Sequence, residues 1–170
     1  RQNYYIVDRL FGAAELRQWL ARRNIGGIGQ PLSVYVHLPF CDTLCWYCGC
    51  NKIVTRDNAR AVRYLDYLAR EIELQGALFS DDSRVGEMHW GGGTPTYQTA
   101  PEMEALHRKV TEHFRIDADA EVAIEVDPRV TSFEQLDLLG ELGFNRISLG
   151  VQDFTPAVQE AIHRNQTEAQ

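Results

Sequence analysis

The sequence predicts an α/β fold in which parallel strands form about half of a TIM-like (β/α) barrel, preceded by an N-terminal helical arm. Two observations support this fold class. Four short segments with the composition of strands alternate with segments of helical spacing, and such alternation is typical of parallel sheets with right-handed crossovers. Cysteines, glycines and acidic residues follow the ends of the expected strands, and that edge carries the active site in (β/α) barrels.

The N-terminal part of the chain, residues 1–31, is expected to be an arm and a linker. Residues 13–23 have the spacing of one amphipathic helix, with leucines and a tryptophan on one side. Residues 24–31, N-I-G-G-I-G-Q-P, are rich in glycine, which indicates a linker. We expect this arm to pack outside the barrel.

Residues 32–170 contain about four βα units. Strands are expected at 33–40, 85–90, 121–126 and 146–151, each with apolar residues and a turn signal or reactive residues at its end. Four units supply about half the strands of an eight-stranded barrel and leave the first and last expected strands as edges, which a complete barrel would cover. We therefore expect residues 32–170 to be the truncated first half of a larger barrel domain.

Short sequence signals mark the helices between these strands. Residues 57–74 carry apolar residues at helical spacing with charges on the opposite face. The T-x-x-E runs at 99–102 and 131–134 predict capping boxes that begin the next two helices. Thr-Pro at 155–156 opens a final helix. We expect Phe133 and two leucines that follow it to face inward.

All four cysteines lie within ten residues, in the run C-D-T-L-C-W-Y-C-G-C that contains Cys41, Cys45, Cys48 and Cys50. Thiolates are the usual ligands of iron–sulfur clusters. The C-x3-C-x2-C part supplies three ligands and leaves one iron of a [4Fe–4S] cluster open to another molecule. A structural zinc site is disfavoured, because such sites usually take two cysteine pairs separated by a longer stretch.

Composition narrows the class of protein further. The sequence shows no signal-peptide pattern and no apolar run of transmembrane length. We therefore expect no membrane span and a cytoplasmic, reducing location, where clustered cysteines more often bind metal than form disulfides. The formal net charge of −7 argues against a nucleic-acid partner, because surfaces that bind nucleic acid are usually basic.

Five sequence blocks between residues 32 and 164 occur together in one known family. They are Y-x-H-x-P-F-C from Tyr35, C-G-C-N-K from Cys48, H-W-G-G-G-T-P-T from His89, E-V-D-P from Glu125 and G-V-Q-D-F from Gly150. In order and spacing they resemble the oxygen-independent coproporphyrinogen III oxidases of the radical S-adenosylmethionine (SAM) superfamily. The resemblance implies a radical SAM barrel, a [4Fe–4S] cluster and two SAM molecules per site.

The resemblance also implies roles for individual residues. Cys41, Cys45 and Cys48 would bind the cluster, whereas Cys50 would be an accessory residue that separates the oxidases from related haem-trafficking proteins. Residues expected to bind SAM are Tyr35, Tyr47, Gly92, Gly93, Thr94, Glu125, Gln152 and Arg164. Among these, Tyr47 would lie against an adenine and Arg164 would pair with a carboxylate of the second SAM. We expect the histidines at 37 and 89 to pack in the core or support a ligand residue.

The reaction implied is the oxidative decarboxylation of two propionates of coproporphyrinogen III to vinyls, giving protoporphyrinogen IX. Hydrogen abstraction from each propionate would be followed by loss of CO2 and one electron, with an unidentified low-potential electron donor and a monomeric full-length protein. Residues 1–6, R-Q-N-Y-Y-I, depart from the family pattern. Two alternatives stay open: a haem-binding or haem-transfer protein of the same fold, against which Cys50 speaks, and another radical SAM enzyme that modifies tetrapyrroles.

Overall fold

The computed structural model describes residues 12–25, 31–80 and 84–167. The helices are α1 (Ala13–Ile25), α2 (Asn58–Gly76), the short 3-10 helix η1 (Pro95–Tyr97), α3 (Ala100–His113), α4 (Phe133–Glu141) and α5 (Pro156–Ala161). The strands are β1 (Leu32–Leu38), β2 (Phe40–Cys41), β3 (Ile53–Val54), β4 (Arg84–Gly92), β5 (Arg115–Val126) and β6 (Arg146–Leu149).

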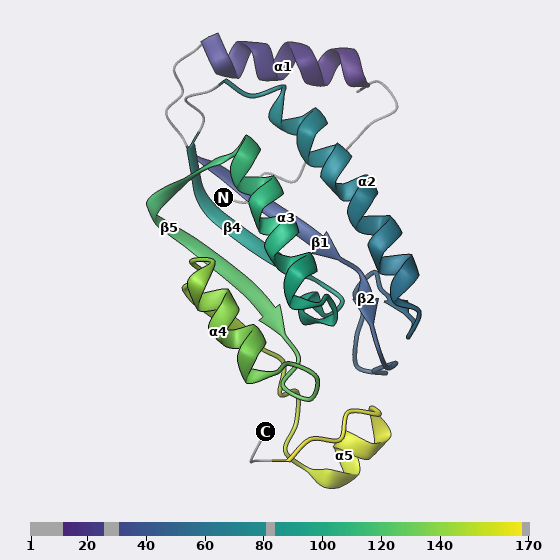
Figure 1. The fold of residues 1–170 in the computed structure, drawn as a ribbon. Coiled ribbons are helices and arrows are strands. Elements are labelled where there is room, and N and C mark those ends of the chain that lie inside the picture. Colours follow the sequence, from purple (N-terminus) through teal and green to yellow (C-terminus); the bar gives the residue numbers. More distant parts are fainter. Residues whose placement is uncertain (1–11, 26–30, 81–83, 168–170) are drawn as a thin grey trace.

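Four of these strands form one parallel sheet in the order β1-β4-β5-β6 (Figure 1). The register places Tyr35 beside His89 and Ala123 beside Arg146. The predicted α/β fold with parallel strands and an N-terminal helix is therefore confirmed. Strands β1 and β6 are the edges of the sheet, as expected for the first and last βα units.

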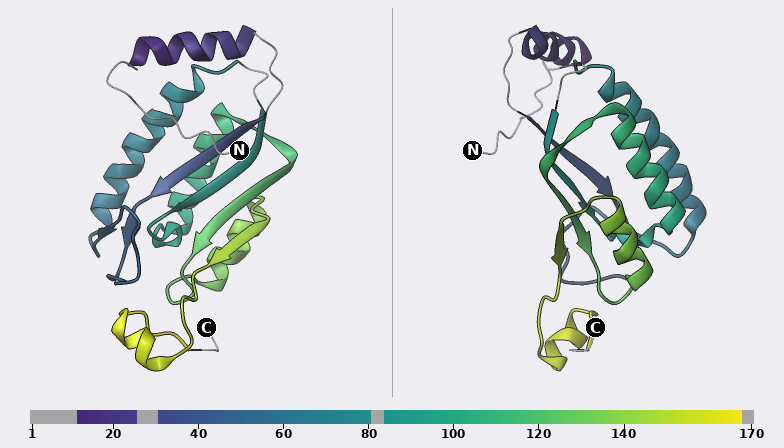
Figure 2. Two further views of the ribbon diagram at one scale, coloured as in Figure 1. Left: turned by 180° about the vertical axis from the view of Figure 1, so that it is seen from behind. Right: turned by 60° about the vertical axis from the view of Figure 1, so that its left-hand side comes forward.

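Helices α2, α3 and α4 cover one face of the sheet, and no described helix covers the other face (Figure 2). The core lies between the sheet and these helices. Its fully buried members include Leu38, Val85, Met88, Trp90, Met103 and Ile124. Met103 comes from α3, whereas the buried side chains of the strands point to the helix side and leave polar ones such as Tyr35, His89 and Glu121 on the uncovered face.

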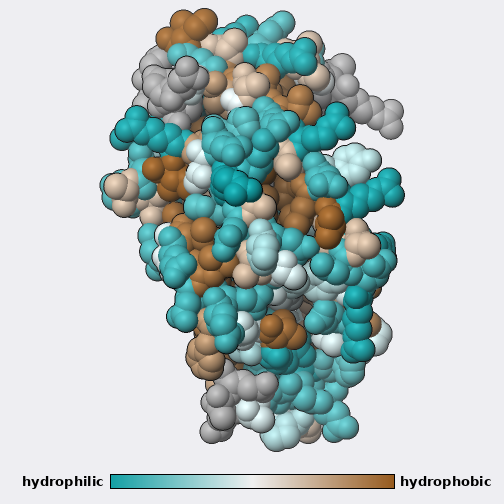
Figure 3. Space-filling view, viewed as in Figure 1, coloured by the Kyte–Doolittle hydropathy of each residue, from teal (hydrophilic) through white to brown (hydrophobic). Residues whose placement is uncertain are grey.

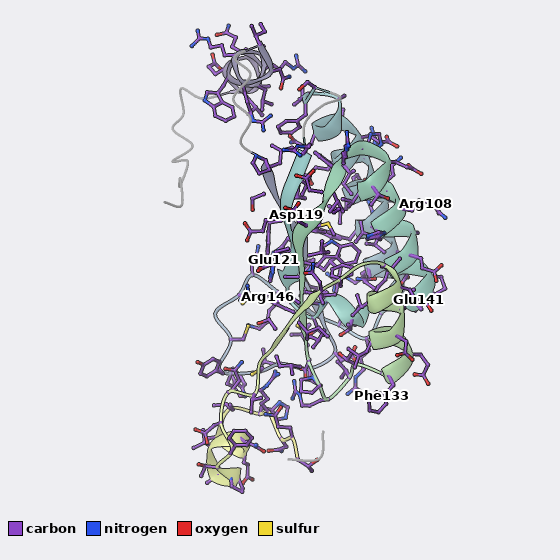
Figure 4. All side chains as sticks on the ribbon, turned by 90° about the vertical axis from the view of Figure 1, so that its left-hand side faces the viewer. Arg108, Asp119, Glu121, Phe133, Glu141 and Arg146 are labelled. Atoms are coloured by element: carbon purple, nitrogen blue, oxygen red, sulfur yellow. The ribbon has the colours of Figure 1, made fainter. Side chains whose placement is uncertain are left out.

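Polar side chains lie on both sides of the sheet. Seen from the helix side, the surface is largely hydrophilic, with apolar patches between the elements (Figure 3). In the edge-on view, Arg108, Phe133 and Glu141 lie on the helix side, whereas Asp119, Glu121 and Arg146 lie on the uncovered side (Figure 4). This uncovered face is therefore polar near the middle of β5.

Helix α1 lies beyond the end of α2, outside the sheet (Figure 1). Asn24 donates a side-chain hydrogen bond to the carbonyl of Leu78 over 3.0 Å, and the Arg23 guanidinium lies 5.6 Å from the ring centroid of Phe79. Leu20 is buried, but Trp19 is 45% exposed, so the expected apolar side of this helix is only partly used. The start of the expected arm and most of the linker fall outside the described residues, and the boundary at residue 31 stays a prediction.

Helix α4 corrects two expectations. Its capping box is formed by Ser132 and Gln135, one residue later than the predicted T-x-x-E run. The hydroxyl of Thr131 instead donates to the carbonyl of Asp127 over 2.8 Å and lies 2.7 Å from the Thr96 hydroxyl. Because of this shift, Phe133 is 84% exposed rather than facing inward.

One strand begins earlier than expected, and one small sheet was not expected at all. Strand β5 begins at Arg115, six residues earlier than expected, and its polar start does not prevent it from pairing with β4. A two-stranded parallel sheet of β2 and β3, which the sequence did not predict, closes the cysteine loop. None of the described helices is long and apolar enough to cross a membrane.

Candidate functional site

A cavity of about 650 Å³ opens at the carboxyl edge of the sheet. It is lined by the cysteine loop (residues 41–50) and by the glycine turn at the end of β4, which comprises Gly92, Gly93 and Thr94. The ends of β5 and β6 and the segment around α5 complete the lining. Of the residues predicted from the sequence, those that line it are Cys41, Cys45, Cys48, Cys50, Tyr47, Gly92, Gly93, Thr94, Glu125, Gln152 and Arg164. Segments more than a hundred residues apart thus meet in one place, as the strand-end argument predicted.

The cysteine loop is held at both ends by backbone hydrogen bonds. The amide of Ile53 donates to the carbonyl of Pro39 over 2.7 Å, and the amide of Thr55 donates to that of Cys41 over 3.0 Å. In its middle, the amide of Trp46 donates to the carbonyl of Ile162 over 2.9 Å. The loop is therefore fixed to its own strands and to the end of α5.

The four cysteines are free thiols in different surroundings. Cys45 is buried, Cys41 and Cys48 are half-buried, and Cys50 is exposed. Burial raises the pKa of the Cys41 thiol. Burial also raises the pKa of Cys48, but hydrogen bonds from Cys50 and the nearby Lys52 ammonium outweigh it and bring the pKa below its ordinary value.

Within the described residues, no three His, Cys, Asp or Glu side chains are gathered as the ligands of a single metal ion. A structural zinc ion needs four ligands at about 2.0–2.3 Å from one point. The ligands of a cubane cluster do not share one point, because each thiolate binds a different iron. The three half-buried or buried thiols of the C-x3-C-x2-C run line one cavity, and three thiolates are a donor set that fits a cluster.

The glycine turn after β4 packs tightly against the cysteine loop. Gly92 has a φ of +115°, and a Cβ at this position would lie 2.6 Å from the His37 ring. A Cβ on Gly93 would lie 2.6 Å from the backbone carbon of Pro39 and 2.7 Å from the carbonyl oxygen of Phe40. The glycines are thus required by contacts within the chain itself, in addition to any ligand that approaches the turn.

Thr94, at the end of this turn, is buried and bonded to the loop in two ways. Its amide donates to the carbonyl of Phe40 over 2.8 Å, and its hydroxyl donates to the Sγ of Cys41 over 3.5 Å. Hydrogen bonds to ligand sulfurs are a means by which proteins tune iron–sulfur clusters. The structure therefore gives Thr94 a contact with an expected cluster ligand.

Glu125, near the end of β5, reaches toward the glycine turn. Its Oε2 accepts a hydrogen bond from the Gly92 amide over 3.2 Å, and its Oε1 lies 3.5 Å from the Nε2 of His89. The exposed ring of Tyr35 stacks on His89 with centroids 5.8 Å apart. Tyr35 does not line the cavity itself, so it reaches the site through neighbouring side chains, of which His89 is one.

His37 links Tyr35 to the cysteine loop. Its Nε2 lies 3.0 Å from the carbonyl oxygen of Asn51, and its Nδ1 lies 3.1 Å from the Tyr35 hydroxyl. Because a carbonyl can only accept, the Nε2 of His37 donates to Asn51. Both histidines therefore lie beside ligand candidates, and neither is buried in the core.

Asp127, Arg129 and Arg164 form a cluster of opposite charges next to the end of β5. The buried carboxylate of Asp127 accepts from Arg129 at Nε (3.0 and 3.2 Å) and at Nη2 (2.6 Å), and from Arg164 Nη1 over 3.2 Å. Arg164 also donates from Nε to the carbonyl of Gly150 over 2.9 Å. Burial raises the pKa of Asp127, but the hydrogen bonds from Arg129 and the charges of both arginines hold it below its ordinary value.

The remaining candidates lie on the open side of the cavity. Tyr47 is 62% exposed, so its ring is available to a ligand rather than packed under the loop. Gln152 is exposed and has a φ of +69°, a conformation that is uncommon outside glycine. The positive φ is an observation of the structure that no sequence signal had indicated.

Two cationic residues that line the cavity had no predicted role. Lys52 donates from Nζ to the carbonyl of Cys48 over 2.8 Å, and Arg129 forms the bidentate pair with Asp127. Both occur in sequence blocks that carried the resemblance or adjoin them, C-G-C-N-K and E-V-D-P-R. Their position in or beside a block of expected ligand residues is the sequence signal that could have identified Lys52 and Arg129 as site residues.

Comparisons with known proteins show which family the chain resembles. The family model of the radical SAM superfamily matches residues 35–170. An oxygen-independent coproporphyrinogen III oxidase of Salmonella typhimurium is 50% identical over 139 residues, which cover 82% of this chain and 30% of the relative. The enzyme of the same name from Pseudomonas aeruginosa is 43% identical over 158 residues, covering 92% of this chain and 34% of the relative.

A solved structure shows the same fold. Coproporphyrinogen III oxidase from Escherichia coli, described as a radical SAM enzyme, superposes with a TM-score of 0.86 at 47% identity, covering 94% of this chain and 36% of that one. The chain spans about a third of the length of the curated relatives it matches.

Proposed function

The chain belongs to the radical SAM superfamily, and we propose that the whole protein is an oxygen-independent coproporphyrinogen III oxidase. It would convert two propionates of coproporphyrinogen III to vinyls and give protoporphyrinogen IX. The observation that carries this proposal is that the thiols of Cys41, Cys45 and Cys48 line the same cavity as the glycine turn and Glu125. The high identity to named oxidases supports the choice of substrate.

The three thiols would hold a [4Fe–4S] cluster with one iron left for SAM. When bound, the cluster supplies an electron and SAM supplies the radical that removes hydrogen from the substrate. The loop anchors at Ile53 and Trp46 would hold the thiols in place before the cluster is inserted. Cys50 would not be a ligand, because one glycine separates it from Cys48 and its amide already donates to that sulfur over 3.4 Å.

The other cavity residues would bind two SAM molecules. The carboxylate of Glu125 and the backbone carbonyls of Gly92 and Gly93 would accept hydrogen bonds from the first SAM molecule. Tyr47 would cover an adenine ring with its exposed face. Gln152 and Arg164 would serve the second SAM, and Thr94 would also contact bound SAM. Tyr35 would act through His89, on which it stacks.

The arginine at 164 enters this scheme with its guanidinium already bound to Asp127 and Gly150. A SAM carboxylate would therefore join an existing network rather than find an unoccupied cation. An electron donor of low potential, a cytoplasmic location and a monomeric full-length protein complete the proposal.

The test is an anaerobic assay of the full-length, cluster-loaded protein with coproporphyrinogen III, SAM and a reductant. We expect protoporphyrinogen IX and CO2, with two molecules of CO2 for each porphyrinogen converted. Cluster assembly and haem binding without loss of CO2 would instead identify a haem-transfer protein of the same fold. SAM cleavage with a tetrapyrrole product that keeps all its propionates would identify another member of the superfamily.

A further inference from the structure

Arg129 lies where a positive charge can act on the expected cluster. It lines the same cavity as Cys41 and Cys45, on the loop that follows β5. Its hydrogen bonds to Asp127 raise the pKa of its guanidinium, and the nearby thiols of Cys45 and Cys41 add to this rise. The guanidinium is therefore charged and lies in the cavity that these two expected ligands also line.

The surroundings of Arg129 fix its position. Its Nε and Nη2 atoms form a bidentate pair with Asp127, and the same carboxylate is held from the other side by Arg164. The three side chains are only 10–15% exposed. Within the described residues, the Nη1 of Arg129 makes no hydrogen bond, so one donor of the fork is left for another acceptor.

The local charge balance is positive. The guanidiniums of Arg129 and Arg164 share the carboxylate of Asp127, which leaves one unit of positive charge on this group of side chains. Because the group is largely buried, that charge is costly unless another negative group is near. The whole cavity lining holds three cations, Lys52, Arg129 and Arg164, and three carboxylates, Asp42, Glu125 and Asp127. The formal charges of the whole lining thus balance, and the excess of positive charge is confined to the two arginines on Asp127.

We propose that Arg129 is a positioning residue that stabilises the reduced state of the cluster by its fixed charge, with Asp127 and Arg164 holding it in place. Uptake of one electron from the reductant makes the cluster more negative by one charge, and no bond forms or breaks in that step. A neighbouring cation favours the more negative state, and charge is one of the factors that set cluster potentials. The inference rests on the cluster binding proposed above.

The experiment measures the midpoint potential of the cluster in the full-length protein, without SAM, by titration with titanium(III) citrate followed by electron paramagnetic resonance. Arg129→Met removes the charge and keeps an apolar side chain, whereas Arg129→Lys keeps the charge without the planar guanidinium. The control is Arg108→Met, which removes an exposed arginine on the outer face of α3 (Figure 4). We expect Arg129→Met to weaken reduction about tenfold, a shift of ~59 mV to lower potential for one electron. Arg129→Lys should lie close to the wild type and Arg108→Met should equal it.

Asp127→Asn provides the second variant, because it removes a negative charge from the same place. We expect its midpoint potential to move in the opposite direction, to higher values. A merely structural role of the ion pairs would instead lower cluster content in both variants without opposite shifts, and that outcome would overturn the proposal.

Two further results separate this inference from its premise. If the wild-type protein binds no cluster, the proposed function itself fails. If the wild type binds a cluster but Arg129→Met has the same potential and a raised Kd for SAM, then Arg129 binds a SAM carboxylate and the inference alone is wrong.

Discussion

The hydroxyl of Thr94 donates to the Sγ of Cys41 over 3.5 Å, and this bond joins the glycine turn after β4 to the first cysteine of the loop. Thr94 is buried, and its amide is used on the carbonyl of Phe40. The same residue thus positions the turn and an expected cluster ligand.

Thr94→Val replaces the hydroxyl by a methyl group of similar shape and leaves the Cys41 sulfur without this donor. A hydrogen bond of about 1 kcal/mol corresponds to about a fivefold faster loss of the cluster to an iron chelator. Thr94→Ser keeps the hydroxyl and should lose the cluster at nearly the wild-type rate. The rates are measured anaerobically by the decay of the cluster absorbance. Equal rates in all three proteins would show that the hydrogen bond from Thr94 does not stabilise the cluster.

The four cysteines should divide into three ligands and one accessory residue. Alanine at Cys41, Cys45 or Cys48 should reduce the bound iron and acid-labile sulfide of the full-length protein to near zero, because each thiolate holds a separate iron. Cys50→Ser should retain both, since its exposed thiol is not expected to bind iron. Loss of the cluster in Cys50→Ser, or reconstitution that yields zinc without sulfide, would contradict the three-ligand site.

Much of the site could be predicted because it depends on local patterns. Strand-like segments ending in reactive residues predicted that the cysteine loop, the glycine turn and Glu125 would meet at one edge, and parallel pairing brings them together. The capping of α3 by Thr99 and Glu102 was also predicted correctly. In these cases, a pattern within one short segment, together with the general rule that such strands pair in parallel, is sufficient to predict the outcome.

The remaining features depend on contacts between distant segments. Two overlapping capping boxes, at 131–134 and 132–135, compete before α4, and the contact of Thr131 with Thr96, 35 residues away, decides for the second. Arg164 meets Asp127 across 37 residues, so sequence spacing indicated a cation but not its partner. The side chain of Arg129 has a partner two residues away, yet its place beside the thiols follows only from packing.

Alanine should have opposite effects at two glycines. In Gly93→Ala the new Cβ would meet backbone atoms of Pro39 and Phe40 at 2.6–2.7 Å, and backbone cannot move aside as a side chain can. We expect a loss of about 1–3 kcal/mol in the free energy of unfolding. At Gly140 in α4, a Cβ would have no neighbouring atom within 4 Å, so Gly140→Ala should stabilise the protein by about 0.5–1 kcal/mol.

Thermal unfolding of the cluster-free proteins measures both effects. The expected order of Tm, from highest to lowest, is Gly140→Ala, then wild type, then Gly93→Ala. A Gly93→Ala protein as stable as the wild type would mean that the turn and the cysteine loop can separate at no cost, and the close packing described for this site would be wrong.

His107 should make the stability of the protein depend on pH. Its ring lies on α3, with its centroid 6.5 Å from that of Trp90 and 6.1 Å from that of Phe144, and burial lowers its pKa from the ordinary value. Between the unfolded pKa of about 6.5 and the lower folded pKa, the unfolded chain therefore binds more protons than the folded one. Stability should fall as the pH falls through this window, and it should be unaffected by this group at higher pH.

The variant His107→Leu removes this titrating group and leaves every other one in place. The difference between the two proteins in free energy of unfolding, measured by urea titration from pH 8 to about pH 5, therefore isolates the contribution of the ring. Below about pH 6.5, the wild type should lose stability relative to His107→Leu, because the unfolded wild-type chain takes up a proton that the buried ring resists. Parallel curves for the two proteins would show that the ring is protonated as easily in the folded state as in the unfolded one.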